Sequence, residues 1–261
     1  KNYNPDFIFH LAAQSLVSSS YQNPKETWET NLLGTLNLLE ILKNVKKKTV
    51  VVIITSDKAY KNVEKKEGYK ENDILAGVDP YSASKSSAEI AIKSYFDSFL
   101  KEKKNIKLGI ARAGNVIGGG DWSKDRLIPD CVSCWSKNKN VSIRNPHSTR
   151  PWQHVLEVVW AYILLAYKLK SVNKINGHAF NFGPSDKANY SVLKLLKTMK
   201  KYWHNVNYSI KNNKKFKESK LLKLNSNKAK KYLNWKNILK FEEKVKLTTD
   251  WYRMYYYKKK K

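Results

Sequence analysis

The sequence predicts an α/β fold with a doubly wound parallel sheet and a smaller lobe after it. Short apolar runs at residues 6–11, 49–54 and 107–112 have the composition of buried parallel strands. Segments with helical apolar spacing separate these runs, so strands and helices alternate along the chain. Such alternation implies right-handed crossovers, which place the strands in one parallel sheet.

The first helix is expected to begin at Asn23-Pro24, since proline fits the first helical turn. Its apolar side chains recur at helical spacing, at Trp28, Leu32, Leu36, Leu39 and Leu42. A second helix is expected over residues 79–100, beginning at Asp79-Pro80. It separates the strand at 49–54 from the strand at 107–112.

Beyond Arg112 the alternation loosens. We expect a flexible loop at 118–122, strands at 141–143 and 178–182, and a buried helix over the apolar run 155–169, which is shorter than the roughly 20 residues of a membrane span. From Gly183 onward the pattern predicts helices and lysine-rich loops without further parallel-strand alternation. We therefore place one domain at 1–125 and a second lobe at 126–261, with one or two segments returning to the sheet and a frayed tail at 258–261.

The composition is that of a globular protein, with 261 residues and a hydrophobic fraction of 41%. The formal charge of +28 does not by itself indicate nucleic-acid binding, because the lysines are spread along the chain instead of forming a stripe with interleaved aromatic residues. The first residues lack the pattern of a secretion signal, which favours a cytoplasmic location.

Cys131 and Cys134 form a Cys-x-x-Cys pattern. A zinc site needs two more ligands at matching spacing, and none is evident, so we expect structural thiols and no metal. The pair implies no disulfide framework, which agrees with a reducing compartment.

Two short motifs carry the chemistry. Tyr81 and Lys85 lie four residues apart on one face of the second helix, where an ammonium group can lower the pKa of a phenol. Asp57 and Lys58 follow a strand directly, at the edge of the sheet where α/β folds collect their functional groups. Together the motifs predict an enzyme that removes a proton and a hydride and then performs acid–base chemistry on the same substrate.

With these motifs, several separated segments resemble the extended short-chain dehydrogenase/reductase family, and within it the nucleotide-sugar 4,6-dehydratases. The segments are 9–14 (FHLAAQ), 30–31 with 34–35, 55–58 (TSDK), 81–85 (YSASK), 112–122 (RAGNVIGGGDW), 125–130 (DRLIPD) and 149–155 (TRPWQHV). The resemblance implies a Rossmann-like fold that binds NAD, and it assigns residues 1–125 to the remainder of the NAD-binding domain. The later residues would form mainly the substrate-binding lobe.

The resemblance also implies a reaction. CDP-glucose would be dehydrated to CDP-4-keto-6-deoxyglucose, for deoxysugar and surface polysaccharide (lipopolysaccharide) biosynthesis. NAD would take a hydride from C4 while Tyr81, assisted by Lys85, removes the hydroxyl proton. Asp57 would then protonate the departing O6, a neighbouring base would take the C5 proton, and the hydride would return to C6.

Site residues follow from the same resemblance. The catalytic set is Ser56, Asp57, Lys58, Tyr81 and Lys85. Cofactor contacts are expected from Leu11, Ala12, Ala13, Asn31, Thr55, Tyr81 and Lys85. Substrate contacts are expected from Gln14, Ser15, Asn115, Arg126, Leu127, Arg144, Arg150 and His154. For His154, substrate contact and a purely structural role before the apolar helix remain equal alternatives.

Two departures from the family pattern matter. Many relatives have glutamate where this chain has Lys58, and an amine can act as the C5 base only if burial or a nearby positive charge keeps it partly deprotonated. The glycine-rich strand–turn–helix motif that binds the dinucleotide pyrophosphate is also missing, so the chain resembles the fold from its fourth strand onward. We expect an exposed sheet edge, poor NAD binding by this polypeptide alone, and in the full-length enzyme a homodimer through the helices near Pro24 and Pro80.

Three alternatives remain open at this point. The nearest is another NAD-dependent nucleotide-sugar epimerase or dehydratase, although epimerases need no acid such as Asp57 to expel water. The others are a basic nucleic-acid-binding protein, which would bind tightly with steep salt dependence, and an inactive fragment.

Overall fold

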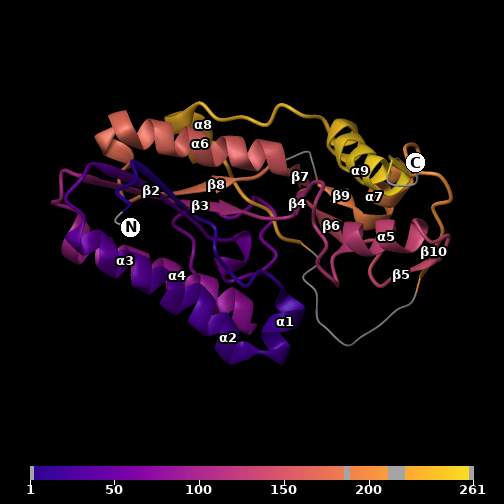
Figure 1. Cartoon of the computed structure of the whole chain (residues 1–261), viewed down its shortest axis with the longest axis horizontal. Coiled ribbons are helices and arrows are strands. Elements are labelled where there is room, and N and C mark those ends of the chain that lie inside the picture. Colours follow the sequence, from indigo (N-terminus) through magenta and orange to yellow (C-terminus); the bar gives the residue numbers. More distant parts are fainter. Residues whose placement is uncertain (1–2, 185–188, 211–220, 259–261) are drawn as a thin grey trace.

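The computed structural model describes residues 3–184, 189–210 and 221–258, and a four-stranded parallel sheet lies at the centre of its larger part (Figure 1). The strand order is β1-β2-β3-β8. These strands are β1 (Phe7–His10), β2 (Thr49–Ile54), β3 (Ile106–Ala113) and β8 (Ala179–Phe182). The predicted parallel sheet is confirmed, and β8 joins it from the later part of the chain by pairing with β3.

Helices cover both faces of the sheet, so the doubly wound arrangement is confirmed. Helices α3 (Gly34–Asn44) and α4 (Pro80–Tyr95) lie on one face, and α6 (Val155–Ser171) and α8 (Asn227–Leu233) lie on the other (Figure 1). Alternate side chains of β2 enter the two layers: Val51 and Ile53 pack with the α3–α4 layer, whereas Val50 and Val52 pack with α6.

The helical layer formed by residues 17–100 is less regular than predicted. A short helix α1 (Val17–Gln22) precedes the expected start at Pro24, and α2 (Pro24–Trp28) joins α3 through a π-helical turn at Glu29–Leu33. A second π-helical turn, Phe96–Leu100, completes the helix predicted over 79–100. The start of α4 is confirmed, since the Asp79 side chain accepts a hydrogen bond from the Ser82 backbone amide at 2.9 Å.

The second lobe has its own core. Its helices are α5 (Leu127–Trp135), α7 (Val192–Met199) and α9 (Phe241–Lys258), and their shared cluster includes Trp135, Leu195, Met199, Val245 and Tyr252. Its short strand pairs are β4 (Val116–Ile117) with β7 (Gln153–His154), β5 (Val141–Ile143) with β10 (Tyr208–Ile210), and β6 (Thr149–Arg150) with β9 (Tyr190–Ser191). The pairing of β5 with β10 is parallel, and β10 is a short strand that the pattern after Gly183 did not predict.

Two 3₁₀ turns of the chain, Asp57–Ala59 after β2 and Asn173–Ile175 after α6, complete the described elements.

Two predicted burial patterns were also wrong. Phe7 and Phe9 of β1 are 41% and 38% exposed, because in the described chain β1 has a neighbouring strand on one side only. Helix α6 is buried along one row of side chains but exposes another. The exposed row contains Leu156, Val159, Trp160, Ile163 and Tyr167. An apolar composition all round therefore did not mean burial all round.

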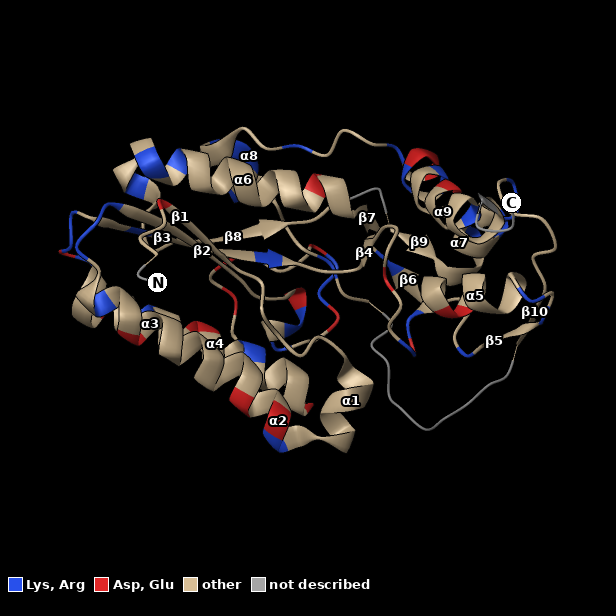
Figure 2. Cartoon of the chain, viewed as in Figure 1, with Lys and Arg blue, Asp and Glu red and all other residues tan. Residues whose placement is uncertain are grey.

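The charge is distributed as predicted from the sequence. Lys and Arg occur on helices and loops of both lobes, with Asp and Glu among them (Figure 2). Among the described residues, no helix is both long enough and apolar enough to cross a membrane. Lys258 is the last residue of α9, and the rest of the predicted tail, residues 259–261, lies outside the described residues.

A buried ion pair connects α4 to the sheet. Glu89 of α4 and Arg112 of β3 are 1% and 4% exposed at their side chains, and the Arg112 Nε donates to both carboxylate oxygens, at 2.8 and 2.9 Å. The Thr55 hydroxyl donates to the same carboxylate at 2.6 Å. Arg112 also donates to the Tyr60 hydroxyl. The pair therefore fixes α4 against the ends of β2 and β3.

We expect Glu89→Ala to lower the free energy of unfolding by about 3–5 kcal/mol, because it leaves the Arg112 guanidinium buried without its counter-ion. Urea titration followed by circular dichroism measures this change. The matched control is Asp97→Ala, which breaks an exposed ion pair with Lys93 at the end of the same helix and should change stability little. Equal effects of the two substitutions would contradict the assignment.

Candidate active site

The catalytic acid predicted at Asp57 lies at the carboxyl end of β2. The strand ends at Ile54, and the Ser56 side chain caps the following 3₁₀ turn by accepting from the Lys58 backbone amide at 3.2 Å. The turn directs Asp57 inward, where its residue is only 3% exposed. Lys58, the next residue, is exposed. The burial that would favour a neutral amine is thus absent at Lys58, and its role as the C5 base stays a prediction.

Two donors and one glycine surround the Asp57 carboxylate. The Ser56 hydroxyl donates to Oδ1 and the Asn115 amide donates to Oδ2, both at 3.1 Å. Asn115 has a left-handed backbone, with φ of 53°. At Gly114 a Cβ atom would lie 1.9 Å from Oδ2, so only glycine allows the carboxylate to lie this close to the backbone. Burial raises the pKa of Asp57, which suits a group that must hold a proton to donate it.

Tyr81 and Lys85 extend from the first turns of α4 toward the same region. Both residues are buried, at 7% and 6% exposure, and the Lys85 Nζ donates to the Ile54 carbonyl at 3.4 Å. Burial lowers the pKa of Lys85 to about 8, and the nearby charge of Glu89 acts against that shift. The structure therefore places the Lys85 amine, which loses its proton more readily than an ordinary lysine, beside the end of β2.

The expectation that Lys85 lowers the pKa of Tyr81 is not met in the chain by itself. Burial raises the pKa of Tyr81 to about 12, and the groups that oppose this shift are the Ser56 side chain, through a hydrogen bond, and the charge of Arg126. The charge of Asp57 raises the pKa further. The pKa of the Tyr81 phenol thus depends on both Ser56 and Asp57, and the phenol is protonated at neutral pH.

Predicted cofactor-side residues meet at the π-helical turn that contains Asn31. The Asn31 amide donates to the Ser84 hydroxyl at 2.9 Å and to the Gln14 carbonyl at 3.0 Å, and its oxygen accepts from the Gln14 amide at 2.9 Å. These bonds tie the segment after β1 to α4. Leu11 and Ala12 are exposed and Ala13 is half-buried, so small and apolar side chains line the end of β1. Thr55 is buried and engaged with Glu89.

Predicted substrate residues divide into those near these groups and those elsewhere. The Arg126 guanidinium donates to the Ser15 hydroxyl at 3.0 Å and forms an ion pair with Asp121 at 3.1 Å. The charge of Arg150 lowers the pKa of Asp57, which places that arginine near the acid. Arg144, by contrast, acts on the carboxyl group of Asp130.

Three of the predicted substrate contacts have structural partners. Gln14 donates from its side chain to the Thr27 hydroxyl at 2.8 Å. His154 is 5% exposed and its Nδ1 accepts from the Leu156 amide at 3.3 Å, capping α6, and burial lowers its pKa. This geometry favours the structural alternative for His154. Leu127 packs against the core of the second lobe at the start of α5.

Residues that sequence reasoning missed are Gly114 and Glu89. Gly114 lies inside the segment 112–122 that carries the family resemblance, but its role depends on a contact with Asp57 that spacing does not reveal. Glu89 lies one helical turn after Lys85, and that spacing was a usable signal.

The two cysteines and the metal-ligating side chains of the described residues form no redox or metal site. Cys131 is buried and Cys134 is half-buried, both thiols are free, and burial raises the pKa of Cys131. Within residues 3–184, 189–210 and 221–258, no cluster of His, Cys, Asp and Glu could hold a metal ion.

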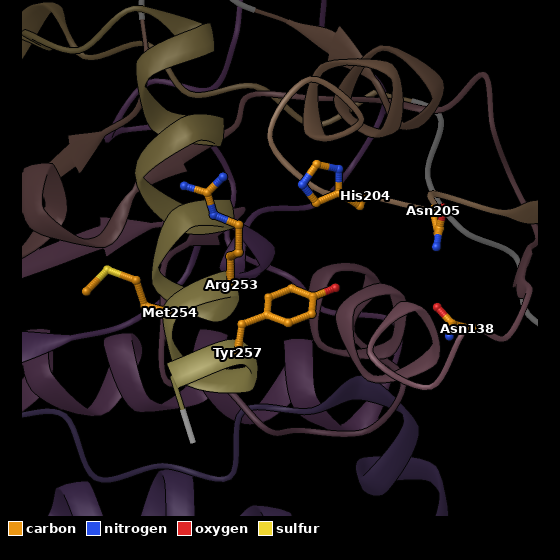
Figure 3. Close-up of a pocket in the computed structure, with 6 residues that line it drawn as sticks. All are labelled: Asn138, His204, Asn205, Arg253, Met254 and Tyr257. Atoms are coloured by element: carbon orange, nitrogen blue, oxygen red, sulfur yellow. The ribbon is translucent and has the colours of Figure 1, made fainter. Parts of the chain in front are cut away.

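A depression lies in the second lobe, at the end of α9 (Figure 3). Its lining residues are Asn138, His204, Asn205, Arg253, Met254 and Tyr257. None of them belongs to the predicted catalytic, cofactor or substrate residues. This depression is therefore separate from the groups around Asp57 and Tyr81.

Comparison with known proteins agrees with this arrangement. A family model described as GDP-mannose 4,6 dehydratase matches residues 1–248. The chain belongs to this family. It is 43% identical over 238 residues to a CDP-glucose 4,6-dehydratase of Salmonella typhimurium, covering 89% of this chain and 66% of that protein. It is 30% identical over 182 residues to a dTDP-D-glucose 4,6-dehydratase of Dictyostelium discoideum, covering 66% and 40%.

A solved structure supports the fold of this family member. The dTDP-glucose 4,6-dehydratase of Bacillus anthracis, in complex with NAD, matches with a TM-score of 0.79 over 98% of this chain and 76% of that chain, at 21% identity. The Rossmann-like short-chain dehydrogenase/reductase fold is thereby confirmed. The chain spans less than two thirds of the length of the two curated relatives above.

We expect Asp57→Asn to be more stable than the wild type at neutral pH, because it removes a charge that is costly to bury. A carboxyl group whose pKa is raised on folding binds more protons in the native state than in the unfolded state. Its contribution to the free energy of unfolding therefore falls as the pH rises from the ordinary pKa of 3.8 through the raised pKa. The advantage of Asp57→Asn should amount to about 1.4 kcal/mol per unit of pKa elevation and should shrink as the pH falls through that window.

Denaturant unfolding of both proteins over a pH series measures this difference. Asp73→Asn is the matched control, because an ion pair with Lys65 lowers the pKa of Asp73 and the sign of the effect reverses. A less stable Asp57→Asn at neutral pH would contradict the raised pKa.

Proposed function

We propose that this chain carries the catalytic groups of an NAD-dependent nucleotide-sugar 4,6-dehydratase, a hydro-lyase that converts CDP-glucose to CDP-4-keto-6-deoxyglucose. The observation that supports this most is the buried carboxyl group of Asp57, whose pKa is raised, linked through Ser56 to Tyr81. An epimerase needs no such acid. The 43% identity to the Salmonella enzyme supports CDP-glucose as the substrate.

NAD is the cofactor in this proposal, and the residues present fit it. Lys85 is buried, and its ammonium group donates one long hydrogen bond, to the Ile54 carbonyl. Ala12 and Ala13, which follow β1, have small side chains and are not buried. Lys85, Asn31 and the segment 11–13 would contact the nicotinamide half. NAD bound there would supply the acceptor for the C4 hydride and the donor of the hydride to C6.

In the oxidation, Tyr81 removes the proton of the C4 hydroxyl. Its pKa of about 12 must fall for this step; the Ser56 hydroxyl and the charge of Arg126 already act in that direction. In this proposal the ammonium of Lys85, one turn along α4, acts in the same direction when cofactor and substrate are bound. Ser56 can hydrogen-bond both the phenol and the C4 oxygen.

In the elimination, Asp57 gives its proton to O6 as water leaves. Asn115 and Ser56 hold the two carboxylate oxygens, so the acid keeps its orientation after losing the proton. Lys58 is the proposed C5 base. Its exposure means that substrate must bury the amine before it can act.

Substrate binding falls to the arginines. Arg126 and Arg150 lie near Tyr81 and Asp57 and suit the diphosphate, because guanidinium groups bind phosphate oxygens in pairs. Arg144, Gln14, Ser15, Asn115 and Leu127 complete the proposed contacts, whereas the cap that His154 forms on α6 supports the structural alternative for that residue. The domain boundary after residue 125 belongs to the same proposal.

The wider setting is a homodimer in the cytoplasm that serves deoxysugar biosynthesis. Ile41 on α3 and Ile90 on α4 are 61% and 59% exposed, which supports association through this helical layer. Sedimentation equilibrium of the intact protein tests the dimer, and Ile90→Lys should convert a dimer to monomers. A wild-type protein that sediments as a monomer contradicts it.

The substrate assignment is tested by incubating the intact protein and NAD with CDP-, dTDP-, UDP- and GDP-glucose. The ultraviolet absorbance of the 4-keto-6-deoxy product in base should appear fastest with CDP-glucose. Formation of a C4 epimer in place of this product would favour the epimerase alternative. Binding of nucleic acid with steep salt dependence and no turnover of any sugar would favour the basic binding protein.

We expect Tyr81→Phe to lower kcat by about 10²–10⁴-fold, because the phenol is the proton acceptor for the oxidation. Tyr95→Phe is the matched control on the same helix, since the Tyr95 hydroxyl bonds Glu40 at the surface and should be dispensable. Steady-state kinetics with CDP-glucose gives both values. An unchanged kcat in Tyr81→Phe rules out Tyr81 as the base.

A further inference from the structure

The loop that joins β4 to α5 is held by a residue outside the predicted site. The buried Tyr252 of α9 donates from its hydroxyl to the Asp121 carbonyl at 2.7 Å and accepts from the Asp121 amide at 3.1 Å. Burial raises the pKa of Tyr252 to about 12, so the hydroxyl stays protonated and serves both bonds at neutral pH. One side chain therefore fixes the backbone of one loop residue.

Aromatic packing closes the same loop onto α9. A Cβ atom at Gly119 would lie 2.1 Å from the Trp251 ring, so the loop backbone rests directly on that indole. The Trp122 ring lies 4.6 Å from the Tyr255 ring and 5.5 Å from the Tyr252 ring, centroid to centroid. Glycine and tryptophan in the segment 118–122 thus both serve this contact.

Helix α9 is itself attached to the main body of the fold. Lys244 of α9 and Glu157 of α6 form an ion pair at 3.0 Å, with side chains 3% and 7% exposed. The Glu157 carboxylate also accepts from the backbone amides of Ile238 and Leu239, just before α9. The position of Tyr252 is therefore set relative to α6 and the sheet it covers.

The same loop residue, Asp121, connects Tyr252 to Arg126. The carboxylate of Asp121 accepts from Arg126 Nη1 at 3.1 Å, and Arg126 Nη2 donates to the Ser15 hydroxyl at 3.0 Å. The Arg126 side chain is 38% exposed, so an anion can reach it, and its charge acts on Tyr81. Arg126 joins a loop of the second lobe to the segment that follows β1.

We propose that Tyr252 is a positioning residue for substrate binding: by fixing the backbone of Asp121 it orients the Arg126 guanidinium toward the diphosphate of the nucleotide sugar. This inference rests on the proposed function. It assigns to the C-terminal helix a part in substrate affinity, although the helix lies outside every motif of the family resemblance.

The test is Tyr252→Phe in the intact protein, which removes the hydroxyl and keeps the ring. We expect the Kd for CDP-glucose, measured by calorimetry, and the KM to rise about tenfold, as for the loss of a hydrogen-bonded link, while kcat changes less than about twofold. Tyr256→Phe is the matched control, because it removes a hydroxyl from the same aromatic cluster one turn later and leaves both Asp121 bonds in place.

A double-mutant cycle separates positioning from general support of the fold. In an Arg126→Met background, Tyr252→Phe should change the Kd less than about twofold, because the group it orients is gone. Asp121→Asn tests the same link at a partly exposed side chain, without touching α9, and should raise the Kd in the same way.

An equal rise in Kd with and without Arg126, or no rise in either Tyr252→Phe or Asp121→Asn, overturns the inference. A wild-type protein that binds none of the nucleotide sugars contradicts the proposed function, and the inference falls with it. Normal binding by the wild type combined with an insensitive Tyr252 leaves the proposed function standing and removes the inference alone.

Discussion

The buried ion pair between Glu89 and Arg112 is the interaction on which the candidate active site depends. It joins the middle of α4 to β3, and through Thr55 it reaches the residue where β2 ends. Tyr81 and Lys85 precede Glu89 on the same helix, and Ser56 and Asp57 follow Thr55. Neither motif could keep its position relative to the other if this pair were displaced. Such a pair costs desolvation energy and contributes little net stability, so its value here is geometric.

Asp57 illustrates how the fold makes an acid. The residue is buried, its two oxygens accept from Ser56 and Asn115, and its backbone neighbour across the site is a glycine with no side chain to displace the carboxylate. Burial favours the protonated form, whereas the nearby charges of Lys58 and Arg150 favour the ionised one. The balance leaves a group that can donate a proton and then bear the charge. That combination is what an elimination of water requires.

Much of this could be predicted from the sequence, and the exceptions have physical reasons. The strand at 49–54, the helix start at Asp79-Pro80 and the return of 179–182 to the sheet follow from local patterns of apolar and capping residues. The π-helical turns interrupt helices whose apolar spacing looks continuous, so spacing could not reveal them. The two motifs proposed to be catalytic could be identified because each is contiguous. The contacts of Asp57 with Asn115 and Gly114 join segments 57 residues or more apart in the chain, which one sequence does not encode in any readable pattern. The pKa of Tyr81 in the chain by itself could not be predicted for a related reason: spacing predicts a neighbour, but burial decides which effect dominates.

The exposed apolar row of α6 has a consequence for the behaviour of the protein in solution. Leu156, Val159, Trp160, Ile163 and Tyr167 leave apolar surface in contact with water on the outer side of that helix. Exposed apolar surface favours association between protein molecules. The formal charge of +28 opposes that association by mutual repulsion. Solubility should accordingly fall as salt screens the repulsion.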